Sequence, residues 1–142
     1  EFQAAYALAK SPRILGNLGL CAMKLERDAE AIDAYSRYLA ETADIEPVER
    51  EQIERDLATL RMGVVRVSLR VEPKDAVIID VRQPVRGEPV RNVYNTKDGT
   101  ASLGLRPGHH VIVARSAQGE SPAWEFDATP GASLSKSLTV AP

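Results

Sequence analysis

Apolar residues between Pro12 and Met62 recur every three or four positions, the interval that gathers side chains on one face of a helix. Three stripes result: Ile14, Leu15, Leu18, Ala22 and Leu25; Ala31, Ile32, Tyr35, Tyr38 and Leu39; and Ile53, Leu57 and Leu60. We therefore predict three helices, the first two paired as a hairpin. The third has charged side chains around its narrow stripe, which suits a helix that caps a stack.

Proline and glycine mark where these helices begin and where they approach each other. Ser11-Pro12 predicts an N-cap and a first helical residue, Asp28 the N-cap of the second helix, and Pro47 the start of the third. Gly19 interrupts the first helix at a cost of about 1 kcal/mol relative to alanine. Such a glycine is tolerable where another helix must approach closely.

Near Gly63 the pattern changes to an alternation of apolar and polar residues, which indicates strands with one buried face. Asp98-Gly99 is typical of a hairpin turn. Predicted strands cover residues 65–71, 77–81, 90–96, 101–105, 109–115, 124–126 and 134–140. We expect an α+β fold, with helices in a domain at 1–62 and a seven-stranded antiparallel β-sandwich at 63–142. The short join, Arg61-Met62-Gly63, argues that the two halves pack as one unit.

Composition and charge exclude several classes of protein. Of 142 residues, 44% are hydrophobic and 27% charged, as in ordinary globular chains, and no apolar run is long enough to span a membrane. A net charge of −2 argues against nucleic-acid binding, and a lone cysteine excludes a disulfide framework. Residues 1–62 carry 8 Lys and Arg against 12 Asp and Glu, and residues 63–142 carry 10 against 8. The helical half is therefore acidic and the β half basic.

The order of large, small and aromatic residues in the helical half also matches a repeated helical motif. Pro12, Leu15, Leu18-Gly19, Ala31 and Tyr35 have the order and spacing of a known motif, and Phe2, Ala5 and Tyr6 have those of the end of a preceding copy. Over roughly residues 1–46 the chain resembles the tetratricopeptide repeat. About three repeats are normally needed for a stable array, and the chain begins at Glu1 without a methionine or signal peptide. We therefore expect a piece of a longer protein, with further repeats upstream.

The resemblance implies a concave groove, lined by first helices of the repeats, that holds an extended or helical peptide. Carried over by position, the groove residues are Arg13, Gly16, Asn17, Leu20 and Lys24. The amide of Asn17 offers both a donor and an acceptor to a ligand backbone. The alternative is that Asn17 is a solvated helix residue without a ligand.

Three segments of the β half carry a second resemblance: Val65-Arg66-Val67-Ser68, residues 73–80 and residues 105–111. They are similar to the bacterial PEGA-type surface domain and its transthyretin-like relatives, with Pro73-Lys74-Asp75-Ala76 in place of the eponymous tetrad. Helical repeats followed directly by this module resemble envelope proteins of deltaproteobacteria such as myxobacteria. The resemblance implies a periplasmic or cell-envelope location.

Few residues suggest catalysis or metal binding. His109 and His110 are adjacent on a predicted strand, so they point to opposite faces and are expected to be structural. Cys21 lies next to Ala22 on an apolar stripe, which predicts a buried, unreactive thiol. Asp75, Asp80 and Asp98 could bind Ca²⁺, but aspartates at turns are also expected for local hydrogen bonding. We expect no enzymatic activity, no cofactor and no metal.

Two further surfaces of the β half are candidates for binding. Its arginines include Arg66, Arg70, Arg82, Arg86, Arg91 and Arg106. Arg66 and Arg70 should share one strand face, which could meet an anionic wall polymer, lipid headgroups or the acidic helical half, or be merely solvated. Trp124 and Phe126 alternate with acidic residues, so they are expected in the core; a stacking platform for sugars is the alternative.

The sequence as a whole predicts a non-enzymatic scaffold. The tetratricopeptide groove would dock a partner protein or peptide, and the sandwich would anchor or position it in the envelope. One alternative is a module that binds peptidoglycan or another wall carbohydrate through the sandwich, or a membrane surface. Another is the sensory tail of a larger receptor. No prediction of the oligomeric state follows from the sequence.

Overall fold

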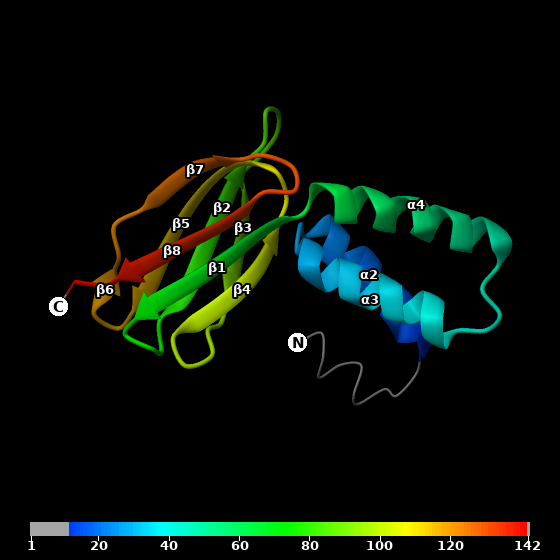
Figure 1. The fold of residues 1–142 in the computed structure, drawn as a ribbon, viewed down its shortest axis with the longest axis horizontal. Coiled ribbons are helices and arrows are strands. Elements are labelled where there is room, and N and C mark those ends of the chain that lie inside the picture. The colour runs from blue at the N-terminus through cyan, green and yellow to red at the C-terminus, as the bar shows by residue number, and fades with distance from the viewer. Residues whose placement is uncertain (1–11, 142) are drawn as a thin grey trace.

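The computed structural model describes residues 12–141, in which three helices precede eight strands (Figure 1). The helices are α2 (Pro12–Lys24), α3 (Asp28–Glu41) and α4 (Pro47–Gly63). The strands are β1 (Val65–Glu72), β2 (Val77–Gln83), β3 (Val90–Tyr94), β4 (Thr100–Leu105), β5 (Gly108–Ser116), β6 (Gly119–Glu120), β7 (Trp124–Ala128) and β8 (Ser133–Thr139). None of the three helices is long and apolar enough to cross a membrane. Ser11, Phe2, Ala5 and Tyr6 lie outside the described residues.

Helices α2 and α3 form the predicted hairpin, and two glycines set how closely they pack. A Cβ atom on Gly19 would lie 2.5 Å from Cδ1 of Tyr35, and one on Gly16 would lie 3.0 Å from Cε2 of Tyr38. The expectation that Gly19 permits close helix approach is confirmed. Gly16 gives the large Tyr38 ring its space in the same way.

Helix α4 begins with Pro47 at its first turn, as predicted, and buries only Ile53, Leu57 and Leu60. These three residues share one apolar core with α2 and α3. The hydroxyl of Tyr38 donates a hydrogen bond to Oε1 of Glu49 at 3.2 Å, which ties α3 to the start of α4. The narrow stripe leaves the other faces of α4 to solvent.

The strands form two sheets that enclose a second apolar core (Figure 1). One sheet has the order β4-β1-β8, and the other has the order β3-β2-β5-β6 with β7 also paired to β5. Strand β1 alternates buried and exposed residues along its whole length. Its valines therefore face the core, and its arginines face outward.

The prediction of seven antiparallel strands is wrong in two respects. The additional strand is β6, which is only Gly119–Glu120 and pairs with the end of β5. It is too short to show any apolar alternation. The other difference is that β8 pairs with β1 in parallel, with Leu134 opposite Val67. The alternation of apolar and polar residues shows which residues are buried. It does not show whether two paired strands run parallel or antiparallel.

The turn at Asp98-Gly99 also differs from the prediction. Both residues have positive φ, 52° and 76°, and Lys97 and Thr100 bridge across them. The turn forms as expected, but β3 and β4 belong to different sheets. The two residues therefore turn the chain from one sheet to the other rather than joining a hairpin.

Candidate functional site

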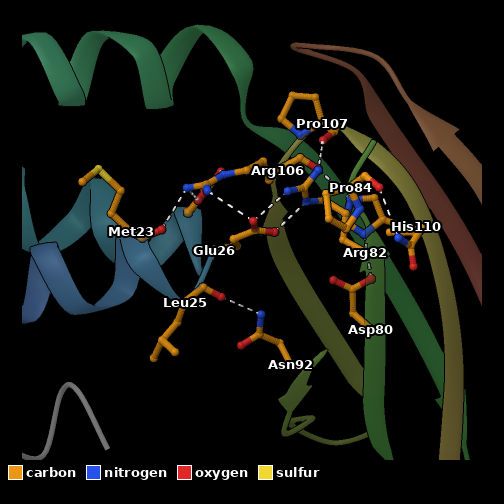
Figure 2. Close-up of polar contacts among 12 residues, drawn as sticks. Met23, Leu25, Glu26, Asp80, Arg82, Pro84, Asn92, Arg106, Pro107 and His110 are labelled. Atoms are coloured by element: carbon orange, nitrogen blue, oxygen red, sulfur yellow. Dashed lines mark hydrogen bonds and ion pairs between the residues drawn. The ribbon is translucent and has the colours of Figure 1, made fainter. Parts of the chain in front are cut away.

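The helices meet the sheets through a polar junction that begins at the end of α2. The amide of Glu26 donates to the carbonyl of Met23 at 3.1 Å, and the amide of Arg27 donates to the carbonyl of Ala22 at 2.8 Å. This pair of bonds is a Schellman motif, which usually places glycine at the residue with positive φ. Here that residue is Glu26, with φ of 63°. Its side chain points at the β half (Figure 2).

Two arginines of the β half form hydrogen bonds with this end of α2 and the residues that follow it. Arg82 on β2 donates two hydrogen bonds to the carboxylate of Glu26, at 2.6 and 2.7 Å. Arg106, between β4 and β5, donates to Asp28 at 2.9 Å. It also donates to the carbonyl of Met23 at 2.9 Å (Figure 2). A cation at a helix C-terminus also satisfies carbonyls that lack helical partners.

The two carboxyl groups respond differently to this environment. Hydrogen bonding from Arg82 holds the pKa of Glu26 below its ordinary value, although burial opposes it. Burial raises the pKa of Asp28, although the hydrogen bond from Arg106 opposes it. Asp28 is not the predicted N-cap: Arg27 occupies that position, and the Asp28 side chain is turned toward Arg106 instead.

Arg27 forms a second group of contacts at the start of α3. Its guanidinium donates two bonds to Glu30, at 2.9 and 2.8 Å, and one to Oδ1 of Asn92 at 3.2 Å. The same group lies 4.3 Å from the centre of the Tyr94 ring. Asn92 in turn donates to the carbonyl of Leu25 at 2.8 Å (Figure 2). Two residues of β3 thus fix the loop between α2 and α3.

A close backbone approach completes the junction. A Cβ atom on Gly104 of β4 would lie only 2.6 Å from Cβ of Ala29 in the first turn of α3. Gly104 pairs with Arg66, whose side chain is exposed, so this contact is on the outer face of the β4-β1-β8 sheet. The start of α3 therefore lies against that face.

His110 and Asp80 support the junction from inside the β half. Nδ1 of His110 lies 2.7 Å from Oδ1 of Asp80, and Nε2 lies 2.6 Å from the carbonyl oxygen of Arg106. Both side chains are buried. His110 therefore fixes the backbone from which Arg106 reaches the helices, which is a structural role, as expected from the sequence. Asp80 is occupied in this pair and does not join Asp75 and Asp98 in a Ca²⁺ site.

Sequence reasoning missed most of this junction. Arginines of the β half do meet the acidic helical half, but they are Arg82 and Arg106 rather than Arg66 and Arg70. The available signal was an acidic residue, Glu26, two positions after the end of a helix, where glycine is usual. Asn92 gives no comparable signal in a single sequence.

Four of the five residues carried over to a peptide groove lie on one side of α2. Arg13, Asn17, Leu20 and Lys24 are exposed, Leu20 to 41%. Gly16, by contrast, faces Tyr38 of α3. Cys21 is exposed, so the prediction of a buried thiol is wrong. Ala22 and Gly19 take the positions facing α3, and Cys21 is turned away from them by the helical rotation.

Arg66 and Arg70 share the outer face of β1 with Ser68, as predicted, and all three are exposed. The hydroxyl-bearing residues of the neighbouring strands lie in register with them. Ser68 is opposite Ser102 and Ser135, and Arg70 is opposite Thr100 and Ser137. These six side chains form the floor of an open groove of about 1120 Å³, which α3 borders on one side.

The aromatic pair of β7 faces the core, as predicted. Trp124 and Phe126 are half-buried, pack against the β core and stack with ring centres 4.1 Å apart. Lys136 covers the Trp124 ring at 5.9 Å. On the opposite face of β7, Glu125 and Asp127 both contact the exposed ring of His109.

The described residues present two exposed surfaces, one side of α2 and the outer face of the β4-β1-β8 sheet. Within residues 12–141 no group of three or more His, Cys, Asp or Glu side chains is placed to hold a metal ion. No protein-family model matches the chain, and a comparison with curated proteins finds no significant match.

Proposed function

We propose that this protein is a non-enzymatic interaction module, in which the helical half docks a partner protein or peptide and the β half holds it in position. The exposed side of α2 carries this proposal. It presents Leu20 together with the cations of Arg13 and Lys24 and the amide of Asn17. On the opposite side of the helix, Leu15 and Ala22 are buried in the core shared with α3 and α4. A peptide with an apolar side chain flanked by carboxylates suits that surface.

The finer assignments belong to the same proposal. We assign α2 and α3 to a tetratricopeptide-like hairpin, α4 to a capping helix, and residues 63–142 to a PEGA-like sandwich of the bacterial cell envelope. The close packing of Gly19 against Tyr35 supports the hairpin assignment. The Trp124 ring is half-buried and covered by Lys136, which argues against a sugar-stacking platform there.

Rigid coupling gives the β half its role in the proposal. Glu26, Asp28 and the carbonyls of Met23 and Leu25 are bonded to residues of three different strands or strand ends. A partner bound on α2 would therefore be held at a fixed orientation to the sheets. A flexible tether would not provide this.

The single cysteine of the chain allows a direct test. Cys21 is exposed and lies one turn from both Asn17 and Lys24, so a maleimide photo-crosslinker attached there samples the proposed surface. We expect one envelope protein or peptide to be crosslinked at Cys21, and the adduct to be lost in an Asn17→Ala, Lys24→Ala variant. A matched control carries Cys21→Ser with Glu54→Cys, which moves the crosslinker to the exposed face of α4. Equal adducts from both positions, or none from Cys21, would contradict the proposal.

A further inference from the structure

The outer face of the β4-β1-β8 sheet carries an ordered array of hydroxyl groups. Ser102, Ser68 and Ser135 lie side by side across the three strands, and Thr100, Arg70 and Ser137 form the adjacent row. Neighbouring strands lie about 4.8 Å apart, so each row offers donors and acceptors at regular intervals. All six side chains of the array are exposed.

This array is the floor of the groove described above. The first turns of α3 border it through Ala29, Glu30 and Asp33, and the turn between β3 and β4 borders it through Asn95, Thr96 and Lys97. Its volume of about 1120 Å³ exceeds the roughly 300–1,000 Å³ of ordinary small-molecule pockets. An extended ligand therefore fits the groove better than a compact one.

The charges of the groove favour an anionic ligand. Its acidic residues have cationic partners of their own, since Glu30 binds Arg27 and Asp33 pairs with Arg37. Neither Arg70 nor Lys97 is in an ion pair with a carboxylate within residues 12–141. The positive charge that remains is thus available to a ligand, and the negative charge is not.

A buried hydroxyl provides an independent observation. Tyr94 is 9% exposed, and its hydroxyl has no hydrogen-bond partner among the described residues. Its ring is fixed by Arg27, and it lines both the groove and a recess of about 90 Å³ bordered by Ala29 and Ser102. A buried polar group without a partner is costly, and a ligand hydroxyl reaching this end of the groove would satisfy it.

We propose that this groove binds an acidic polysaccharide, with the serine and threonine rows contacting sugar hydroxyls and Arg70 and Lys97 contacting the anionic groups. Five of the six floor side chains carry hydroxyl groups and the sixth is Arg70, so the floor matches a ligand rich in hydroxyls that also carries negative charge. Carboxylate and phosphate groups would be bound by the same chemistry. The site is separate from the exposed side of α2, so a test of polysaccharide binding here is independent of a test of the function proposed above.

Calorimetric titration of the whole chain tests this. The probes are hexagalacturonate, which carries carboxylates, and a glycerol phosphate oligomer, which carries phosphates; neutral maltohexaose and a polyglutamate peptide are controls. We expect at least one of the two anionic probes to bind, and Arg70→Gln to weaken it about tenfold through loss of charged hydrogen bonds. Arg91→Gln, an exposed strand arginine outside the groove, should leave the affinity unchanged.

Two variants separate recognition from simple charge attraction. Ser102→Val and Tyr94→Phe remove hydroxyls without altering charge, and each should weaken the anionic probe several-fold while leaving thermal stability unchanged or higher. Four outcomes would overturn the proposal: no binding of either anionic probe, equal binding of polyglutamate, equal effects of Arg70→Gln and Arg91→Gln, or no effect of the two hydroxyl variants.

Discussion

Glu26 has a backbone conformation, with φ of 63°, that costs residues other than glycine about 1 kcal/mol. The glutamate carboxylate at this position bonds to Arg82 and lies 3.4 Å from Arg106. A glycine would end the helix with less strain but would leave both arginines without this partner. Individual residues of this kind, unfavourable locally and useful at a distance, mark the junction between the two halves.

His109 offers a test at the scale of a single side chain. Its ring nitrogens lie 2.8 Å from Asp127 and 2.7 Å from Glu125, and the hydrogen bonds to Asp127 and then to Glu125 raise the pKa of His109 above the ordinary 6.5. The resulting stabilisation is full below the unfolded pKa and is lost as the pH rises through the folded pKa.

NMR titration of the His109 ring should therefore give a midpoint above 6.5, and Asp127→Asn should move it down. The melting temperature should fall slightly as the pH rises through that midpoint. A midpoint at or below 6.5 in the unaltered protein would show that the two carboxylates do not hold the ring.

The helices and strands were predicted well from the sequence, whereas the pairing of the strands with one another was not. The apolar stripe of α4 and the alternation in β1 identify buried faces correctly, because burial is a property of each position. Sheet order depends on which strands meet after folding. The parallel partner of β1, β8, comes at the end of the chain, and nothing local distinguishes it from an antiparallel strand. The junction residues were missed for the same reason, since Asn92 and Leu25 O are bonded across 67 positions.

The packing of α2 against α3 leads to a prediction at this scale. The new Cβ of Gly19→Ala would lie 2.5 Å from the buried Tyr35 ring, an overlap that should cost about 2 kcal/mol. Helix propensity offsets about 1 kcal/mol of this cost, so the free energy of unfolding should fall by about 1 kcal/mol. Urea denaturation measures it. Asn17→Ala on the exposed side of the same helix is the control, and it should leave stability equal or slightly higher. A stabilised Gly19→Ala variant would mean that the two helices are farther apart.

At the scale of the whole molecule, the helices and sheets are held together mainly by polar contacts. The apolar cores of the two halves are separate. Between them lie the Glu26–Arg82 and Asp28–Arg106 ion pairs, the Arg27 contacts and the Ala29–Gly104 approach. The relative orientation of the halves therefore depends on charge more than on the internal packing of either half.

Removing one charge at the junction should show how much the ion pairs between the two halves contribute to stability. Glu26→Gln leaves the largely buried Arg82 guanidinium without its carboxylate partner, which should lower the free energy of unfolding by about 2 kcal/mol at neutral pH. The lowered pKa of Glu26 means that its contribution is present above pH 4.5 and is lost as the pH falls through the folded pKa. The difference in melting temperature from the unaltered chain should shrink accordingly in acid. Glu54→Gln, exposed on α4, is the control, and equal behaviour of the two variants would contradict the prediction.

The parallel pairing of β1 with β8 has a consequence for how the protein is made. As the chain leaves the ribosome, β1 emerges early but cannot acquire this neighbour until Leu134 has also emerged. Until then one edge of β1 has unpaired backbone groups, which are prone to pair with other chains. The helices, whose contacts are local, can form first. A nascent chain stalled before β8 should therefore have folded helices and a protease-sensitive β half.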